Sequence, residues 1–248
     1  MKAIGFEQGK ASPCTFFHKK RGIRTYIHGD DFVSVAKDED LKWLKTGIEK
    51  KYELKTQVLG PTKPDFQEVR VLNRILRWTP EGVKYEADPR HAELIIKDLG
   101  LSKANSVSTP GTKEEGRTRE DNQDLLDNTK SSEYRAIVAR MNYLAADRPD
   151  IAFAVKEAAR EMSNPTLGGW DRPKRIGRYL KGKPVVKQVI GRSMGMDDQV
   201  EVFTDSDWSG CLEDRRSVSG GCIMWRGYMI KTWSKDQKHL ALSSAEAE

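Results

Sequence analysis

Two adjacent aspartates, Asp30 and Asp31, are the residues of this sequence with the clearest chemical potential. Apolar and β-branched residues precede and follow them, with Gly29 just before the pair, a pattern that predicts two antiparallel strands joined by a tight turn. Neighbouring carboxylates repel each other unless a cation lies between them. The usual solution is a divalent metal ion with oxygen ligands and a phosphate substrate. The alternative is an ordinary polar turn.

A second set of acids lies near the C-terminus. Asp205 ends an alternating strand pattern at 200–205, and Glu248 lies in the first turn of a helix that follows two more predicted strands. A three-strand meander can return that helix to the first strand, which would form half of a site for two metal ions ~4 Å apart. Asp207 competes with Asp205. Glu246 competes with Glu248, although its spacing from Ser243 fits a capping box. The alternative is acids at a strand end and a helix start.

Basic residues are concentrated in 131–192, which has 13 Lys and Arg against 6 Asp and Glu. A predicted helix from about residue 167 carries the densest group, and its basic side chains are expected to face outward. Such a surface suits a phosphate backbone, and the alternative is a solvated helical face. The candidate nucleic-acid-binding residues are Arg172, Lys174, Arg175, Arg178 and Lys181.

The composition narrows the class of protein. With 248 residues, 37% hydrophobic and 32% charged, the chain has room for one large domain or two modest ones. Its three cysteines and four histidines lack metal-binding spacing, which argues against a zinc site. A signal peptide and an apolar run of ~18 residues are both lacking. We therefore expect an intracellular protein, cytoplasmic or nuclear, with no membrane partner.

Helical and alternating patterns both occur, which predicts an α+β fold. The predicted helices cover 38–52 with Asp38 as the N-cap, 89–99, a segment capped near Ser131 or Ser132, 149–162 and a segment from about 167. The predicted strands cover 53–59, 66–72, 75–78 and 83–86, followed by the meander at 200–205, 216–225 and 228–233. A tight turn at Arg226-Gly227 is predicted to join the last two strands. Residues 102–130 have few apolar side chains and dense charge, so they are interpreted as an exposed linker.

Several motifs together resemble copia-type retrotransposon Pol polyproteins, which carry a reverse transcriptase and a ribonuclease H. The motifs occur in the order of that family across nearly the whole chain. They are Gly5-Phe6 through Ser12-Pro13-Cys14, the Asp30-Asp31 hairpin, Ser132-Glu133-Tyr134-Arg135, 144–154, Met162-Ser163-Asn164-Pro165, Arg178-Tyr179-Leu180-Lys181-Gly182, 204–210, Asp214-Arg215-Arg216-Ser217, Ser219-Gly220 and 242–248.

The resemblance implies four regions: the late palm and a thumb-like region at 1–101, a linker at 102–130, basic connecting helices at 131–198, and the start of a ribonuclease H-like mixed sheet at 199–248. It implies that Asp30 and Asp31 hold Mg²⁺ or Mn²⁺ for RNA-directed DNA polymerisation. It also implies that Asp205 and Glu248 hold the metal ions for cutting RNA. The implied partners are an RNA template, a DNA primer, RNA–DNA hybrid, deoxynucleoside triphosphates and the rest of the polyprotein.

Two departures from the family pattern matter. His28 and Gly29 stand where relatives carry an aromatic and an aliphatic residue, so primer handling is expected to differ. The family's other polymerase aspartate would lie before Met1, and its remaining ribonuclease H acids after Glu248. We therefore expect an internal fragment that is inactive in isolation. The alternatives are a non-catalytic remnant that binds nucleic acid and, on Gly29-Asp30-Asp31 alone, a piece of an RNA-dependent RNA polymerase.

Overall fold

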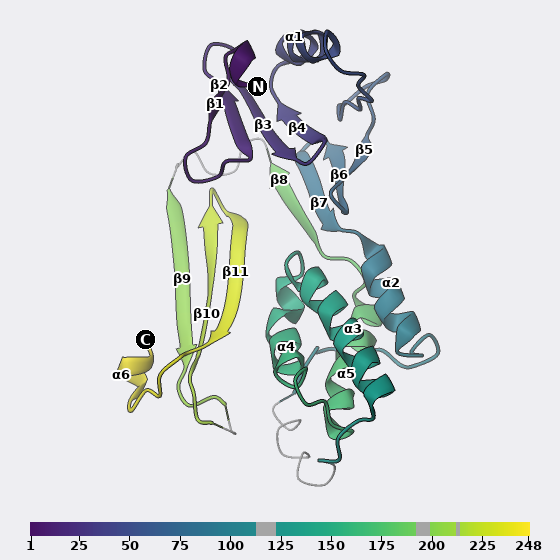
Figure 1. Cartoon of the computed structure of the whole chain (residues 1–248), viewed down its shortest axis with the longest axis vertical. Coiled ribbons are helices and arrows are strands. Elements are labelled where there is room, and N and C mark those ends of the chain that lie inside the picture. The colour runs from purple at the N-terminus through teal and green to yellow at the C-terminus, as the bar shows by residue number, and fades with distance from the viewer. Residues whose placement is uncertain (113–122, 192–198, 212–213) are drawn as a thin grey trace. The chain divides into compact units, whose positions relative to one another are not determined.

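The computed structural model of this chain describes residues 1–112, 123–191, 199–211 and 214–248. The chain divides into two units, Met1–Phe66 and Gln67–Glu248 (Figure 1). The architecture is mixed α+β, as predicted, and the described residues form three antiparallel sheets and six α-helices. Parts of the predicted linker (113–122) and of the predicted connecting segment (192–198) lie outside the described residues. No helix among the described residues is both long and apolar enough to cross a membrane.

The first unit is a four-stranded sheet with one helix. Its elements are a 3-10 turn (Lys2–Ile4), β1 (Glu7–Gln8), β2 (Thr15–His18), β3 (Ile23–His28), β4 (Asp31–Val35) and α1 (Asp38–Glu49). The strands pair in the order β1-β2-β3-β4. In β3, buried Ile23 and Thr25 alternate with exposed Arg24 and Tyr26, so the two faces of the sheet differ. Leu44 of α1 packs with Ile23 on the buried face.

Helix α1 confirms the periodicity seen in the sequence but not its predicted ends. Asp38, the predicted N-cap, is the first helical residue, and Lys37 takes the cap position without a side-chain hydrogen bond. Three acids in the first turn favour the positive end of the helix dipole. The helix ends at Glu49 rather than near residue 52.

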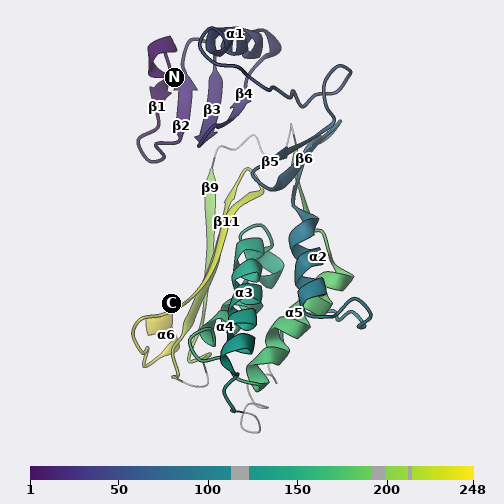
Figure 2. The ribbon, with the colours of Figure 1, turned by 45° about the vertical axis from the view of Figure 1, so that its right-hand side comes forward.

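The second unit contains a sheet in which, counting the described residues only, four helices lie between the last two strands. Its elements are β5 (Glu68–Val71), β6 (Arg74–Thr79), β7 (Gly82–Ala87), α2 (Pro89–Asp98), α3 (Asn128–Ala145), α4 (Pro149–Arg160), a 3-10 turn (Gly168–Trp170), α5 (Asp171–Gly182) and β8 (Lys187–Gly191). The strands pair in the order β5-β6-β7-β8 (Figure 1), and Figure 2 shows α3, α4 and α5 side by side. β8 lies within the segment that the sequence predicted to be helical. The apolar faces of α2 to α5 form the main core, around Tyr134, Met141, Ile151, Ile176 and Leu180.

The start of α3 corrects the prediction of a cap at Ser131 or Ser132. Asp127 is the N-cap, because its side chain accepts a hydrogen bond from the Lys130 amide at 2.8 Å. Ser131 lies one turn inside the helix and is buried. The last residues of the predicted linker are therefore the first turn of α3.

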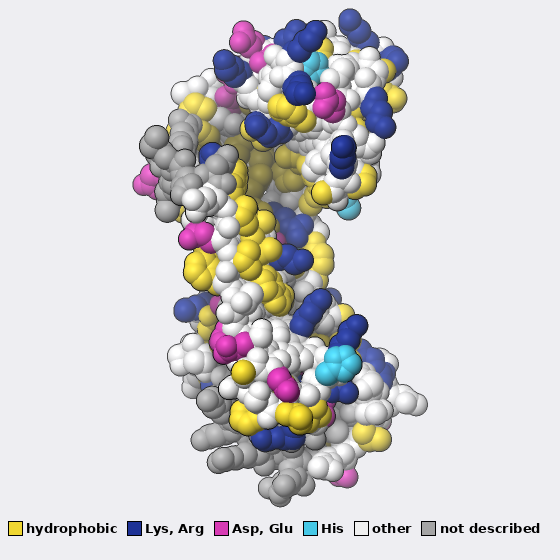
Figure 3. Space-filling model, turned by 90° about the vertical axis from the view of Figure 1, so that its left-hand side faces the viewer, with side chains coloured by type: hydrophobic (Ala, Val, Ile, Leu, Met, Phe, Trp, Pro, Cys, Tyr) yellow, Lys and Arg dark blue, Asp and Glu magenta, His cyan; other side chains and the backbone are white. Residues whose placement is uncertain are grey.

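The C-terminal part of this unit is the predicted meander. Its elements are β9 (Val200–Asp207), β10 (Val218–Trp225), β11 (Tyr228–Asp236) and a short helix, α6 (Ser244–Ala247). Strands β10 and β11 join at Arg226-Gly227, both with positive φ (52° and 75°), as a type I′ hairpin turn requires. All of β9 except Ser206 is exposed, and hydrophobic side chains gather along this sheet (Figure 3).

The meander packs against α4 through ion pairs between an acid on β11 and two basic residues of α4. Asp236 accepts hydrogen bonds from Lys156 (2.9 Å) and from Arg160 (Nε, 3.0 Å). Arg160 also donates to the sulfur of buried Cys211, at 2.9 Å. These contacts join the C-terminal half of α4 to the end of β11.

Candidate functional site

The aspartate pair occupies the predicted hairpin. His28 pairs with Asp31 across β3 and β4, which leaves Gly29 and Asp30 as a two-residue loop. Gly29 has φ +61°, a conformation that costs a residue with a side chain more than it costs glycine. Both aspartates are exposed, so their carboxylates are accessible to a ligand.

Asp31 lies on the face of the sheet that α1 leaves open. The strand register puts Asp31, His28, Tyr26 and Arg24 on this face, and puts Ile23 on the face that α1 covers. Arg24 stacks its guanidinium over the ring of Phe17, 5.3 Å from the centroid. The Asp31 carboxylate therefore shares an exposed face with a cation and aromatic rings.

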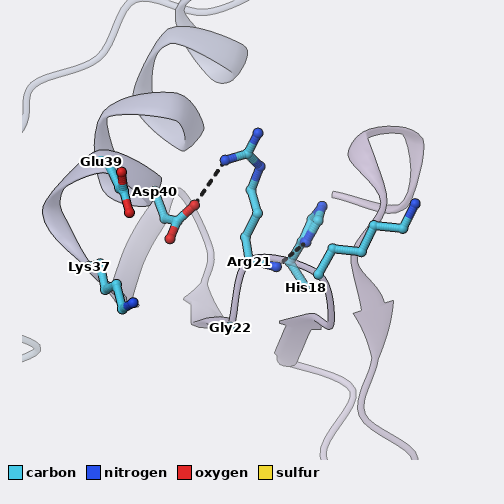
Figure 4. Close-up of a pocket in the computed structure, with 7 residues that line it drawn as sticks. His18, Arg21, Gly22, Lys37, Glu39 and Asp40 are labelled. Atoms are coloured by element: carbon cyan, nitrogen blue, oxygen red, sulfur yellow. Dashed lines mark hydrogen bonds and ion pairs between the residues drawn. The ribbon is translucent and has the colours of Figure 1, made fainter.

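An open pocket of about 780 Å³ in the same unit lies on the other side of this sheet, at the start of α1 (Figure 4). Arg21 crosses it, stacks over Trp43 and donates to Asp40 at 2.9 Å. His18, which lines the pocket, is buried and accepts a hydrogen bond from the Arg21 amide at 3.3 Å. Since Arg21 is already held by an acid and a ring, these contacts support the loop between β2 and β3.

The second set of acids is arranged in part as predicted. Asp205 and Asp207 both point to the face of the meander that meets α4, where they pair with Gly220 and Val218 of β10. Both line an open cleft of about 350 Å³ together with Phe153 at the start of α4. Because two strand positions separate them, the structure brings both acids to one cleft and leaves the choice between them open.

The short helix α6 explains the role of Glu246. Ser243 Oγ accepts from the Glu246 amide at 3.2 Å, and a carboxylate oxygen of Glu246 accepts from the Leu242 amide at 2.6 Å. The Ser243 contact is the predicted cap, whereas Glu246 reaches the amide one residue before the N-cap, so Glu246 also serves the helix start. α6 packs against β9, and Gln237 ties it to the sheet through Ser219 and the Ala247 carbonyl. Glu248 follows α6 and is exposed.

Neither set of acids forms a cage for a metal ion. In the part of the chain that the structure describes, no three His, Cys, Asp or Glu side chains come together as metal ligands would. Mg²⁺ is nevertheless commonly bound by one or two carboxylates, with water and substrate phosphates completing its shell. The paired carboxylates of Asp30 and Asp31 fit that mode of binding.

The basic residues of α5 do not all face outward as predicted. Arg172 is buried at 8% exposure, donates to the Glu157 carbonyl at 2.7 Å and lies 3.6 Å from the Glu161 carboxylate. Its charge is used inside the helical bundle, because a buried guanidinium needs acidic and carbonyl partners. Lys174 lies 3.4 Å from Asp171 and is half-exposed.

The other three basic side chains of α5 hold the chain that precedes α3. Arg175 donates to Thr109 Oγ1 (2.9 Å), and Arg178 Nε donates to the Asn105 carbonyl (2.7 Å). Lys181 donates to two further carbonyls, those of Ser102 (2.7 Å) and Ala104 (2.8 Å). The segment interpreted as a free linker is thus attached to α5 over 102–109.

The structure also contains a buried charge network that the sequence did not predict. Arg148 is 1% exposed and makes paired hydrogen bonds to Asp150 at 2.8 and 2.9 Å. It also donates to the carbonyls of Lys183 and Pro184, while the Tyr179 hydroxyl donates to Asp150. Burial would raise the pKa of Asp150, but Arg148 and Tyr179 hold it below its ordinary value. The Arg-Pro-Asp sequence was the available signal.

Known proteins identify the family. The chain is 28% identical, over its whole length, to the retrovirus-related Pol polyprotein from transposon TNT 1-94 of Nicotiana tabacum. It is 33% identical over 170 residues, 68% of the chain, to the Pol polyprotein from transposon RE2 of Arabidopsis thaliana. This chain belongs to the retrovirus-related Pol polyproteins of copia-type transposons.

This Pol segment spans 18% of the TNT 1-94 polyprotein and 11% of the RE2 polyprotein. It also matches AtMg00810, an uncharacterized mitochondrial protein of Arabidopsis thaliana, with 33% identity over 68% of each chain. No protein-family profile matches it, and no solved structure does. The resemblance predicted from the motifs is therefore confirmed at the level of the family.

Proposed function

We propose that this Pol segment carries the metal-binding hairpin of a reverse transcriptase and the first part of a ribonuclease H. The observation that carries the proposal is the placement of Asp30 and Asp31. They sit at a two-residue turn, on a sheet whose other face is covered by α1. Exposed carboxylates at a rigid turn suit a substrate that brings its own phosphates to the metal ion.

In the Pol polyprotein, Asp30 and Asp31 would hold Mg²⁺ or Mn²⁺. The bound ion would neutralise charge on the triphosphate as a primer hydroxyl attacks it. The residues of this chain would contribute position: the β3–β4 pairing fixes the two carboxylates, and the open face leaves room for a primer and template. His28, opposite Asp31, would lie beside the primer end.

The placement of acids on and after the meander supports the proposed ribonuclease H activity. Asp205 lies on a strand beside a helix whose cap is already formed, which leaves Glu248 available as a second acid. We infer that these two carboxylates would bind metal ions for cutting RNA in an RNA–DNA hybrid. Asp207 is the alternative to Asp205, because both line the same cleft.

The palm, thumb-like and ribonuclease H regions, with the partners that they require, belong to this proposal. Those partners are an RNA template, a DNA primer, RNA–DNA hybrid and deoxynucleoside triphosphates. An RNA-dependent RNA polymerase gains no support from the family matches. The non-catalytic alternative predicts that no carboxylate of this chain affects DNA synthesis.

Metal binding by the chain itself gives a first test. Titration with Mn²⁺, followed by electron paramagnetic resonance, should show weaker binding for Asp30→Asn and Asp31→Asn. Glu53→Gln is the matched control, because Glu53 is an exposed carboxylate in the same unit. Equal Mn²⁺ binding by all four proteins would contradict the assignment of the hairpin.

Activity is tested in a Pol polyprotein that includes this segment. Primer extension on an RNA template should fall at least about 100-fold for Asp30→Asn. The reason is that Asp30 would hold the metal ion that stabilises the charge of the transition state. Asp205→Asn should abolish hybrid cleavage and leave primer extension intact. Full extension by the Asp30→Asn polyprotein would favour the non-catalytic remnant.

A further inference from the structure

Residues 102–109, here called the strap, lie along α5 and occupy its cations. Arg175, Arg178 and Lys181 recur every three residues, so their side chains lie on neighbouring positions of one side of the helix. All three donate to the strap: to the Thr109 hydroxyl and to the carbonyls of Asn105, Ser102 and Ala104. The basic side of α5 is thus covered by the chain itself.

Two glycines of α5 let the strap approach closely. A side chain at Gly177 would meet Leu101 Cδ1 at 2.7 Å, and one at Gly182 would meet Ser106 Cβ at 3.0 Å. Gly182 therefore contacts the strap itself, and Gly177 contacts the residue just before it. Neither glycine has a positive φ, so the backbone of α5 accepts alanine at both positions.

The strap offers these cations only uncharged acceptors. Its sequence, Ser-Lys-Ala-Asn-Ser-Val-Ser-Thr, contains no Asp or Glu, and its one charge is Lys103. A guanidinium or ammonium group makes stronger, shorter hydrogen bonds to a phosphate oxygen than to a carbonyl. A phosphodiester backbone would be the better partner for the same three donors.

We propose that the strap is an internal competitor for the phosphodiester backbone of nucleic acid, which must displace it to reach Arg175, Arg178 and Lys181. This inference rests on the proposed nucleic-acid role of these residues and adds its regulation. The apparent affinity of the chain is the affinity of the released form multiplied by the fraction of molecules in which the strap is released. Lifting the strap without removing a cation therefore strengthens binding.

The test uses a wedge at Gly182. Gly182→Ala places a methyl group against Ser106 and leaves every cation in place. The double variant Gly182→Ala/Ser106→Gly restores the space and is the matched control. We measure the Kd of the full chain for a fluorescent RNA–DNA hybrid at fixed salt, and we check folding by circular dichroism.

Gly182→Ala should bind the hybrid about threefold more tightly than the wild-type chain, and the double variant should return to the wild-type Kd. Unchanged or weaker binding by folded Gly182→Ala would overturn the proposal. Absence of hybrid binding by every variant would overturn it too, since no competitor would exist. Metal binding at Asp30 and Asp31 is measured separately, so failure of the proposed polymerase site leaves this result readable.

Hydrogen exchange of the wild-type chain gives an independent readout. Adding hybrid should speed amide exchange in 102–109, because displacement exposes the strap to water. A purely structural strap would exchange at the same rate or more slowly with hybrid present, which would refute displacement. This measurement needs no variant and decides the question even if Gly182→Ala does not fold.

Discussion

His28 lies directly opposite Asp31 across β3 and β4, on the sheet face that α1 leaves open. Two features of the hairpin follow from this pairing. The loop between the strands has only two residues, and its first residue must take a left-handed conformation, which Gly29 does at φ +61°. The residue that precedes the aspartates is therefore selected by the backbone as well as by chemistry.

Gly29→Ala should destabilise the first unit by about 1 kcal/mol, because an added side chain is strained at positive φ. Gly47→Ala is the matched control. An added Cβ meets nothing within 4 Å at either glycine, but Gly47 lies inside α1. It should gain about 0.5–1 kcal/mol. Urea unfolding of both variants checks the opposite signs, and a stabilising Gly29→Ala would show that the turn is not left-handed in solution.

Local patterns in the sequence predicted the elements that hold the candidate site. The strands around Asp30, the Arg226-Gly227 turn and the cap at Ser243 depend on residues close in sequence, and the structure confirms all three. The family matches confirm the Pol resemblance. The alternation of apolar and polar residues, together with the residue types at turns and helix starts, was sufficient to predict these features.

Contacts between distant residues were beyond the reach of these patterns. Arg172 was expected on the surface because arginine usually is, but carboxylates of α4 and of the residue after it surround it. β8 was missed because its partner, β7, lies about a hundred residues earlier in the chain. Residues 102–109 were interpreted as part of an exposed linker because α5 holds them mainly through backbone carbonyl oxygens, which every residue type carries.

Among single arginine variants, Arg148→Ala should lower the free energy of unfolding of the second unit most, by about 3 kcal/mol. The change leaves Asp150 and two carbonyls without their buried cation. Arg140→Ala is the control. Arg140 pairs with Asp98 at the surface, where both side chains are about a third exposed, and its loss should cost less than about 1 kcal/mol. Thermal unfolding measures both, and similar melting temperatures would refute a stabilising role for Arg148.

The same network predicts an acid-dependent stability. Arg148 holds the pKa of Asp150 below its ordinary value despite burial. Such a group stabilises the fold above its unfolded pKa, ~3.9, and this contribution is lost as the pH falls through the lower folded pKa. Asp150→Asn should therefore be less stable than the wild-type chain at pH ~7, and the difference should shrink toward pH ~3. The control Asp171→Asn, at an exposed position, should have the same stability as the wild-type chain at each pH. Urea unfolding midpoints measured across this pH range test both expectations.

The raised pKa of Tyr85 predicts that the stability of the fold also depends on pH in the alkaline range. Burial and a hydrogen bond to Asp147 raise its pKa to about 12, against the opposing effect of Arg74. A raised pKa stabilises the fold below the unfolded value, ~10, and that stability is lost as the pH rises through the folded pKa. Tyr85 should therefore titrate late in the tyrosinate absorbance of the folded chain. So should Tyr179, whose pKa is also raised by burial and by its hydrogen bond to Asp150. Tyr85→Phe should reduce the amplitude of this late step, whereas the control Tyr52→Phe, at a side chain 67% exposed, should leave it in place. A late step of unchanged amplitude in Tyr85→Phe would mean that the contact between Tyr85 and Asp147 does not form in solution.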